Sequence, residues 1–338
     1  MPQTLRPPVS GELGARAEHG AARRRNVVTA VAGALAATAV LAFVLADRRE
    51  EFGAALGGAP IWILLAATAL QLLALVSRTE AWHVCVGAAG GSVARRRLYR
   101  AASLGYLGGQ LNCQMGTAAR IAALRRAAPD ECPRVPALIA AEVPILAVET
   151  ALAALASFTL VGPLGLPWWL PLVLLATAVL LVGGLGKVAA RWREGFWSGL
   201  AVLRSLRARN GVVALILVAV AAQIARNWLM LDAVGVHASL LDATAVLIAM
   251  VMLTQLPIGP SVGAAAVVVI LGANGVALAA AAGALLTATG TAGALAFVTW
   301  AGIDRVCMLR CAATRRSAPY PSPAHVSHEP QPAIGVTR

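Results

Sequence analysis

Repeated apolar runs of about 20 residues constrain this chain more than any other feature of its sequence. A helix needs about 20 apolar residues to cross the roughly 30 Å of hydrocarbon in a bilayer. The chain has several such runs, and over its 338 residues it is 59% hydrophobic and only 13% charged, with a mean hydropathy of +0.75. Soluble domains are about half apolar and a quarter charged. The sequence therefore predicts an all-α, polytopic helical membrane protein.

The apolar runs predict about eight membrane spans within a single transmembrane domain. This domain covers residues 27–305, between a disordered tail at 1–26 and a proline-rich tail at 306–338. An even number of spans places both tails on one side of the membrane. The predicted spans are 27–46, 60–80, 135–160, 164–184, 211–231, 243–258, 262–285 and 287–303.

The basic residues indicate which side that is. The net charge is +13, and of the 28 Lys and Arg residues only Arg48, Arg49 and Arg226 lie outside four segments. Those segments are 6–25, 78–134, 187–209 and 305–338. Lysine and arginine concentrate in cytoplasmic loops, where they also contact anionic lipid. The pattern predicts a multi-pass protein of the cytoplasmic (inner) membrane with both termini in the cytoplasm, and it disfavours a nucleic-acid partner.

The segment 98–118 is also largely apolar, but a ninth span there would export several arginines. A re-entrant segment, which enters and leaves on the same side, keeps those arginines in the cytoplasm. Backbone that breaks its helix at membrane depth must be covered by protein or face water. Glycines permit the close packing that such a segment requires, and this segment supplies them at Gly105, Gly108, Gly109 and Gly116. We expect a re-entrant segment, with a ninth span as the alternative.

Charged and amide side chains within spans are candidates for a functional site, because burying them in a membrane is costly. Glu142 and Glu149 lie seven residues apart and share a helical face. Arg226 lies in a later span beside Gln223 and Asn227. A rise of about 1.5 Å per residue puts Glu149 and Arg226 at similar depths, so we expect an ion pair between them and no fixed partner for Glu142. The pair either joins two helices or lines a polar cavity with its neighbours.

Two stretches break otherwise apolar segments, QLNCQMGTAA at 110–119 and QLPIGPSVGAAA at 255–266. With Glu142 between them, they resemble in order and spacing the flippase-like transmembrane domain of lysylphosphatidylglycerol synthases and related membrane proteins. That family has an N-x(3)-P-x-R-x-G-E-x-x-R element, an E-R-x-x-D element and a late P-x-x-P-G-G-x-G element. The positions that fit these elements are Gly116, Arg120, Glu142, Pro257, Pro260 and Gly263. Other positions differ from the family pattern: Asn112, Gln114, Thr117, Val143 and Leu146 replace the expected residues.

The resemblance implies translocation of a polar lipid or a lipid-linked intermediate. The substrate path would then be formed by the fitting positions together with the interior residues Glu142, Glu149, Gln223, Arg226 and Asn227. Its partners would be membrane lipids and a lipid-linked substrate, while no protein partner is indicated. Two alternatives stay open, an ion-coupled transporter of small solutes and a membrane scaffold that transports nothing. The chain shows no set of catalytic residues and no cofactor or metal motif, so we do not expect an enzyme.

Overall fold

A computed structural model describes residues 49–317, except for 112, 166, 192–194, 254–266, 269 and 271–275. All regular secondary structure in this part of the chain is helical, which confirms the predicted all-α class. The predicted span 27–46 and the second broken stretch at 255–266 lie outside the described residues. Pro257, Pro260 and Gly263 lie outside them as well.

Four helical segments in the described part are long and apolar enough to cross a membrane. They are α3 (Ile61–Ala88), the segment Val135–Leu160, α10 (Leu206–Ala233), and Ala277–Asp304 within α13 (Val276–Ser317). Two further helices have shorter apolar stretches, α9 (Trp169–Arg191) and α11 (Leu240–Leu253). These helices indicate a membrane-embedded protein, but the eight predicted spans are not confirmed.

The spans 262–285 and 287–303 were predicted to be separate, and here the structure differs. A single helix, α13, runs without a break from Val276 to Ser317, through the predicted junction and past the predicted domain boundary at residue 305. The local sequence GALLTATGTAG contains glycine and threonine but no proline. Glycine weakens a helix by only about 1 kcal/mol, whereas proline removes a backbone donor and clashes with the preceding turn.

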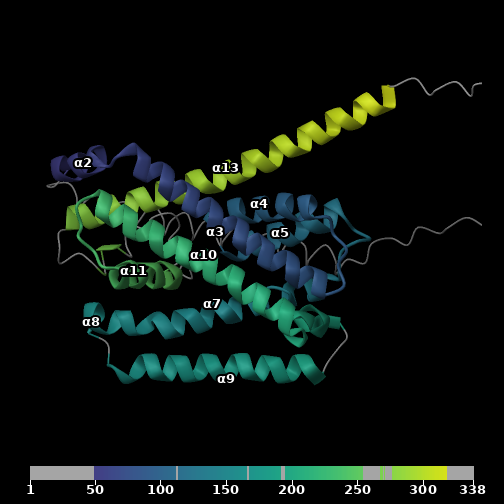
Figure 1. The fold of residues 1–338 in the computed structure, drawn as a ribbon, viewed down its shortest axis with the longest axis horizontal. Coiled ribbons are helices and arrows are strands. Elements are labelled where there is room, and N and C mark those ends of the chain that lie inside the picture. Colours follow the sequence, from purple (N-terminus) through teal and green to yellow (C-terminus); the bar gives the residue numbers. More distant parts are fainter. Residues whose placement is uncertain are drawn as a thin grey trace, which may run out of the picture.

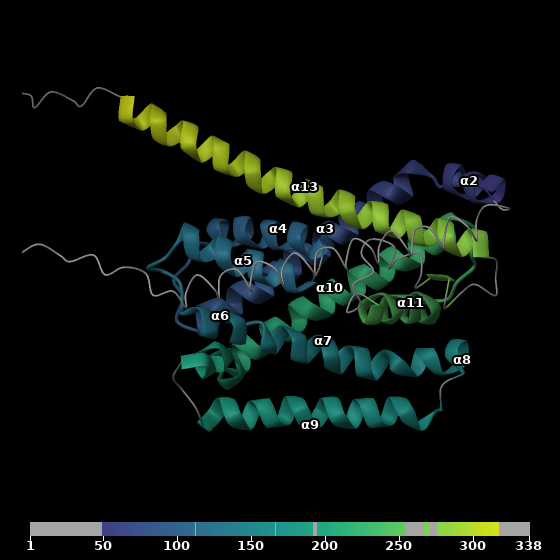
Figure 2. The same ribbon diagram turned by 180° about the vertical axis from the view of Figure 1, so that it is seen from behind.

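The centre of the bundle is formed by α3 and α10, which run side by side in opposite directions (Figure 1). Helix α13 crosses them on one face, and short α2 (Arg49–Gly58) lies beside α13 near the start of α3. On the other face, α7 (Val143–Ala156) is followed by η2 (Ser157–Leu160), α8 (Val161–Leu164) and then α9. Figure 2 shows α9 as the outermost helix on that face, alongside α7. Most of its exposed side chains between Leu172 and Leu181 are apolar, as expected for contact with lipid: Leu172, Val173, Leu174, Val179, Leu180 and Leu181.

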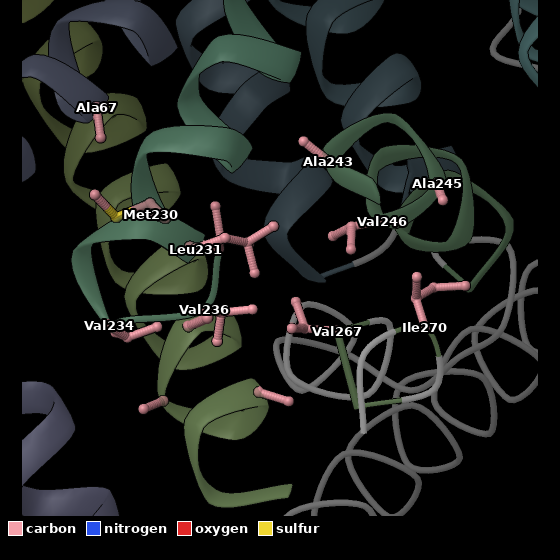
Figure 3. Close-up of a cluster of buried hydrophobic side chains, with 14 of the residues drawn as sticks. Ala67, Met230, Leu231, Val234, Val236, Ala243, Ala245, Val246, Val267 and Ile270 are labelled. Carbon is pink, nitrogen blue, oxygen red and sulfur yellow. The ribbon is translucent and has the colours of Figure 1, made fainter. Parts of the chain in front are cut away.

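The largest hydrophobic core joins α3, α10, α11 and α13 (Figure 3). Met230 and Leu231 of α10 are fully buried, and Ala243 and Val246 of α11 pack in the same cluster. Much of the α13 contribution consists of alanines. Small side chains let membrane helices approach closely, which explains why so much of this bundle is built from alanine.

The predicted span 135–160 is interrupted. Helix α6 (Val135–Ala140) ends in a turn at residues 141–142, and α7 begins at Val143 with Pro144 in its first turn. Proline has no N–H to donate to the preceding turn, so one helical hydrogen bond is missing there, while Ala141 and Glu142 keep helical backbone angles. Glu142 lies at this break. The 3-10 helix η3 (Gly195–Arg204) packs closely on α6, because Gly199 has no side chain to keep the two apart.

Helices α4 (Arg95–Leu111) and α5 (Cys113–Ala127) form a tightly packed antiparallel hairpin. A Cβ atom on Gly116 would lie 2.7 Å from the carbonyl oxygen of Gly105, and one on Gly108 would lie 3.2 Å from that of Met115. At the base of the hairpin, Arg97 pairs with Glu131 at 2.6 Å. Both ends of the hairpin therefore lie at one end of the bundle, which agrees with the re-entrant course predicted for residues 98–118, but the returning helix continues to Ala127.

Candidate functional site

Four ionised side chains meet inside the bundle and form what we call the interior charge cluster: Arg78, Arg120, Glu142 and Glu149. Arg78 of α3 donates from Nε to Glu149 of α7 at 2.7 Å. Arg120 of α5 pairs with Glu142 at the α6–α7 break. The Arg120 and Glu142 side chains are only 13% and 11% exposed. Two cations and two anions make the cluster neutral, so it can tolerate burial that a single charge could not.

Aromatic and hydroxyl groups surround this cluster. The guanidinium carbon of Arg120 lies 4.3 Å from the centre of the Trp82 ring, in a cation–π contact. The Tyr106 hydroxyl donates to the carbonyl oxygen of Leu75 at 3.0 Å and lies 3.1 Å from the Thr79 hydroxyl. The hairpin is thus connected to the spanning helices through polar contacts as well as apolar ones.

Helix α3 carries the polar groups of the interior along one face. Gln71, Arg78 and Trp82 are separated by seven and four residues, and Thr79 lies beside Arg78. Residues three, four and seven apart share a helical face. Gln71, Thr79 and Trp82 are buried. We call these four residues, Gln71, Arg78, Thr79 and Trp82, the α3 polar stripe.

The stripe reaches a second charged site, on α10. Arg226 is 6% exposed; it pairs through Nη1 with Gln71 Oε1 and donates through Nη2 to the carbonyl oxygen of Leu286 at 3.3 Å. Gly290 of α13 lies next to the guanidinium, and a Cβ atom there would be 3.5 Å from Nη1. At about 1.5 Å per residue, the seven residues between Gln71 and Arg78 put the two charged sites about 10 Å apart along α3.

The predicted ion pair between Glu149 and Arg226 is wrong. Glu149 pairs with Arg78, and Arg226 bonds to Gln71. The expectation that Glu142 has no fixed partner is also wrong, since Arg120 pairs with it. Depth in the membrane did not predict the partner of Arg226. Helix α10 packs mainly against α3, and this packing brings Gln71 next to Arg226.

Three other predicted site residues, Gly116, Gln223 and Asn227, lie outside these ion pairs. Gly116 is buried in the hairpin contact, where it lets α5 approach α4. Gln223 is half-buried on α10, one turn before Arg226. Asn227 is 1% exposed, and neither polar atom of its side chain has a hydrogen-bond partner among the described residues.

The sequence prediction missed Arg78, Gln71 and Tyr106. It counted Arg78 with the cytoplasmic arginines, whereas the helix continues ten residues beyond it to Ala88. One signal was available: Gln71 and Arg78 occur seven residues apart in an otherwise apolar run. That spacing indicates a polar face on a helix.

An open groove of about 590 Å³ lies on the outside of the bundle, between α3, α4 and α13. Apolar and aromatic side chains line most of it, and two arginines stand at its edge. The lining residues are Leu72, Val76, Arg95, Arg96, Tyr99, Ala296, Phe297 and Trp300. The Tyr99, Phe297 and Trp300 rings pack against one another with centroids 5.7 to 5.9 Å apart.

Acidic residues hold the arginines at the groove. Arg95 donates to Glu80 at 2.5 Å, and this hydrogen bond raises the pKa of the Arg95 guanidinium. Arg100 donates to Asp304 of α13 at 2.5 Å, and Arg96 lies 3.8 Å from the same carboxylate. The groove therefore combines an apolar floor with a charged rim, which is the pattern expected for an amphipathic ligand.

These sites can bind charged groups, and within the described residues no group of three or more His, Cys, Asp or Glu side chains could hold a metal ion. Comparison with protein-family models, with curated proteins and with solved structures finds no match.

Proposed function

We propose that this membrane protein translocates a polar lipid or a lipid-linked intermediate. The observation that carries the proposal is the α3 polar stripe, which joins two buried charged sites at different depths. Ionisable side chains are rare within membrane spans, because each one is costly to bury, and those that occur commonly mark a substrate or ion path. A row of them along one helix provides successive binding positions for a polar head group.

The groove between α3, α4 and α13 supports an amphipathic substrate. Its apolar walls suit an acyl chain, and the arginines at its edge suit a phosphate or another anionic group. The groove is lined in part by α3, the helix that also carries the α3 polar stripe. The head group would leave the groove for the interior while its acyl chains remain in lipid.

The interior charge cluster supports passage of a head group, because its ion pairs can exchange partners. A zwitterionic or charged head group can replace Glu149 on Arg78, or Glu142 on Arg120. Because the head group takes the place of the displaced carboxylate, each arginine stays paired during the exchange. The energetic cost of moving the head group from one arginine to the next is therefore low. The resemblance of 110–119 and 255–266 to flippase-like domains agrees with this substrate class.

The orientation is also part of the proposal. The ends of α3 and α5 and the start of α10 lie at one end of the bundle (Figure 1). This end carries eight of the basic residues in the described part of the chain: Arg95, Arg96, Arg97, Arg125, Arg126, Arg134, Arg207 and Arg209. By the positive-inside rule it faces the cytoplasm, in the inner membrane.

Reconstitution into liposomes tests the proposal. Fluorescent derivatives of phosphatidylglycerol, phosphatidylethanolamine and a glycolipid are placed in both leaflets, and dithionite quenching measures exchange between the leaflets. We expect accelerated exchange of at least one derivative and a loss of that acceleration in Arg78→Gln. Arg207→Gln, at an exposed position, is the matched control and should keep it. Exchange no faster than in protein-free liposomes for all three derivatives would overturn the proposal.

A specific observation favours a second candidate, the ion-coupled transporter. Glu142 Oε1 is buried and has no hydrogen-bond partner among the residues that the structure describes. A carboxylate with one oxygen paired and the other available can take up and release a proton. Proton-coupled solute uptake that Glu142→Gln abolishes, without any lipid exchange, would favour this candidate.

A further inference from the structure

Arg226 is buried, and it differs from the partly buried arginines of the bundle because no acidic side chain pairs with it in the described structure. Arg78, Arg100 and Arg120 each pair with a carboxylate. The partners of Arg226 are the neutral oxygens of Gln71 and Leu286.

The connection from α11 to α13 offers no counter-charge in its sequence. Residues 254–275, which join α11 to α13, contain no Asp or Glu. The acidic residues of the interior are already bound to other arginines, Glu142 to Arg120 and Glu149 to Arg78. A buried cation without an opposite charge is strongly unfavourable, so an anion from outside the chain would stabilise the site.

The polar groups at the site suit such an anion. Arg226 Nε is buried and lacks a hydrogen-bond partner among the described residues, and the same holds for the Asn227 amide. Gly290 leaves the space beside the guanidinium without a side chain. Guanidinium and amide N–H groups are donors that phosphate and carboxylate oxygens accept.

We propose that Arg226 and Asn227 form a buried binding site for an oxyanion such as phosphate, and that Gln71 holds the guanidinium in place through its side-chain oxygen. The phosphate can come from a free ion or from a lipid head group. This inference goes beyond the proposed function, since a protein that moves no lipid would still bind an anion at this site.

Binding of radiolabelled inorganic phosphate to the purified full-length protein in an uncharged detergent tests the proposal. We expect saturable binding, weakened about tenfold or more by Arg226→Gln and unchanged by Arg207→Gln. Asn227→Ala is the second test variant, used if Arg226→Gln does not fold, because it keeps the buried cation. It should also weaken phosphate binding. Failure of wild-type protein to bind phosphate saturably, or equal binding by wild type and Asn227→Ala, would overturn the proposal.

Competition identifies the source of the phosphate. Phosphatidylglycerol that displaces the labelled ion, where diacylglycerol does not, would indicate a lipid head group. Phosphate binding that neither lipid displaces would indicate a free ion. The liposome assay is separate from this measurement, so loss of lipid exchange with intact phosphate binding would overturn only the proposed transport.

Discussion

Arg120 and Glu142 join the two irregular parts of the bundle. Arg120 comes from the second helix of the hairpin, and Glu142 lies at the break that Pro144 makes between α6 and α7. Arg120 also stacks on Trp82 of α3. One ion pair therefore connects the hairpin, a broken helix and a spanning helix.

Removing one partner of this pair should destabilise the protein strongly. We expect Glu142→Gln or Arg120→Gln alone to lower the free energy of unfolding by about 3–5 kcal/mol, since each leaves a buried charge unpaired. The double variant should lose less than the sum of the two. Unfolding in mixed micelles with increasing dodecyl sulfate measures these differences.

The pair Arg97–Glu131 is the matched control for this cycle. Its side chains are 43% and 38% exposed, and exposed pairs contribute about 0–1 kcal/mol. Additive effects of the two substitutions at Arg120 and Glu142 would contradict the interior pairing.

The hairpin should depend on the absence of a side chain at Gly116. Gly116→Leu would place its Cβ atom 2.7 Å from the Gly105 carbonyl oxygen, and overpacking of this kind typically costs about 1–3 kcal/mol. Thermal unfolding of the purified protein measures the loss. Gly183→Leu is the control on α9, where a Cβ atom meets nothing within 4 Å; equal melting temperatures for the two variants would argue against close packing of α4 on α5.

The two ends of the hairpin should be accessible from the same side of the membrane. Single cysteines introduced at Arg97 and Arg125, in a background without native cysteines, should react with a membrane-impermeant maleimide from one face only. The ion pair between Arg97 and Glu131 and the proximity of the two ends are the reasons. Labelling from opposite faces would mean that the segment crosses the membrane.

Cys132, in the loop after α5, should react slowly at neutral pH. Partial burial raises the pKa of its thiol above the ordinary value, and only the thiolate is nucleophilic. In a variant that keeps Cys132 alone, the alkylation rate should rise about tenfold per pH unit between pH 7 and 9, because the thiolate fraction rises in that proportion below the pKa. A rate that levels off at or below pH 8 would contradict the raised pKa.

Several features of the fold could be predicted from local sequence. Apolar runs identify the segments around α3, α7 and α10, because a helix must be apolar over a membrane's thickness. The glycines and flanking arginines of 98–118 indicate a segment that turns back within the membrane. The glycines permit its two halves to pack closely, and the arginines at both ends must stay on the same side of the membrane. Glu142 and Arg226 were identified as site candidates from their residue type and their place within apolar spans, whereas Gly116 and Arg120 were identified from the resemblance to flippase-like domains.

The pairing of these residues was decided only by the tertiary structure. Composition and depth are properties of one helix at a time, and they suggested Glu149 as the partner of Arg226. Which helices pack together depends on the fit of small side chains along their whole length, and here α10 lies against α3. That packing brings Gln71 to Arg226 and leaves Arg78 for Glu149. The sequence by itself therefore determined that Glu142, Glu149 and Arg226 lie within apolar spans, and the helix packing determined which groups they meet.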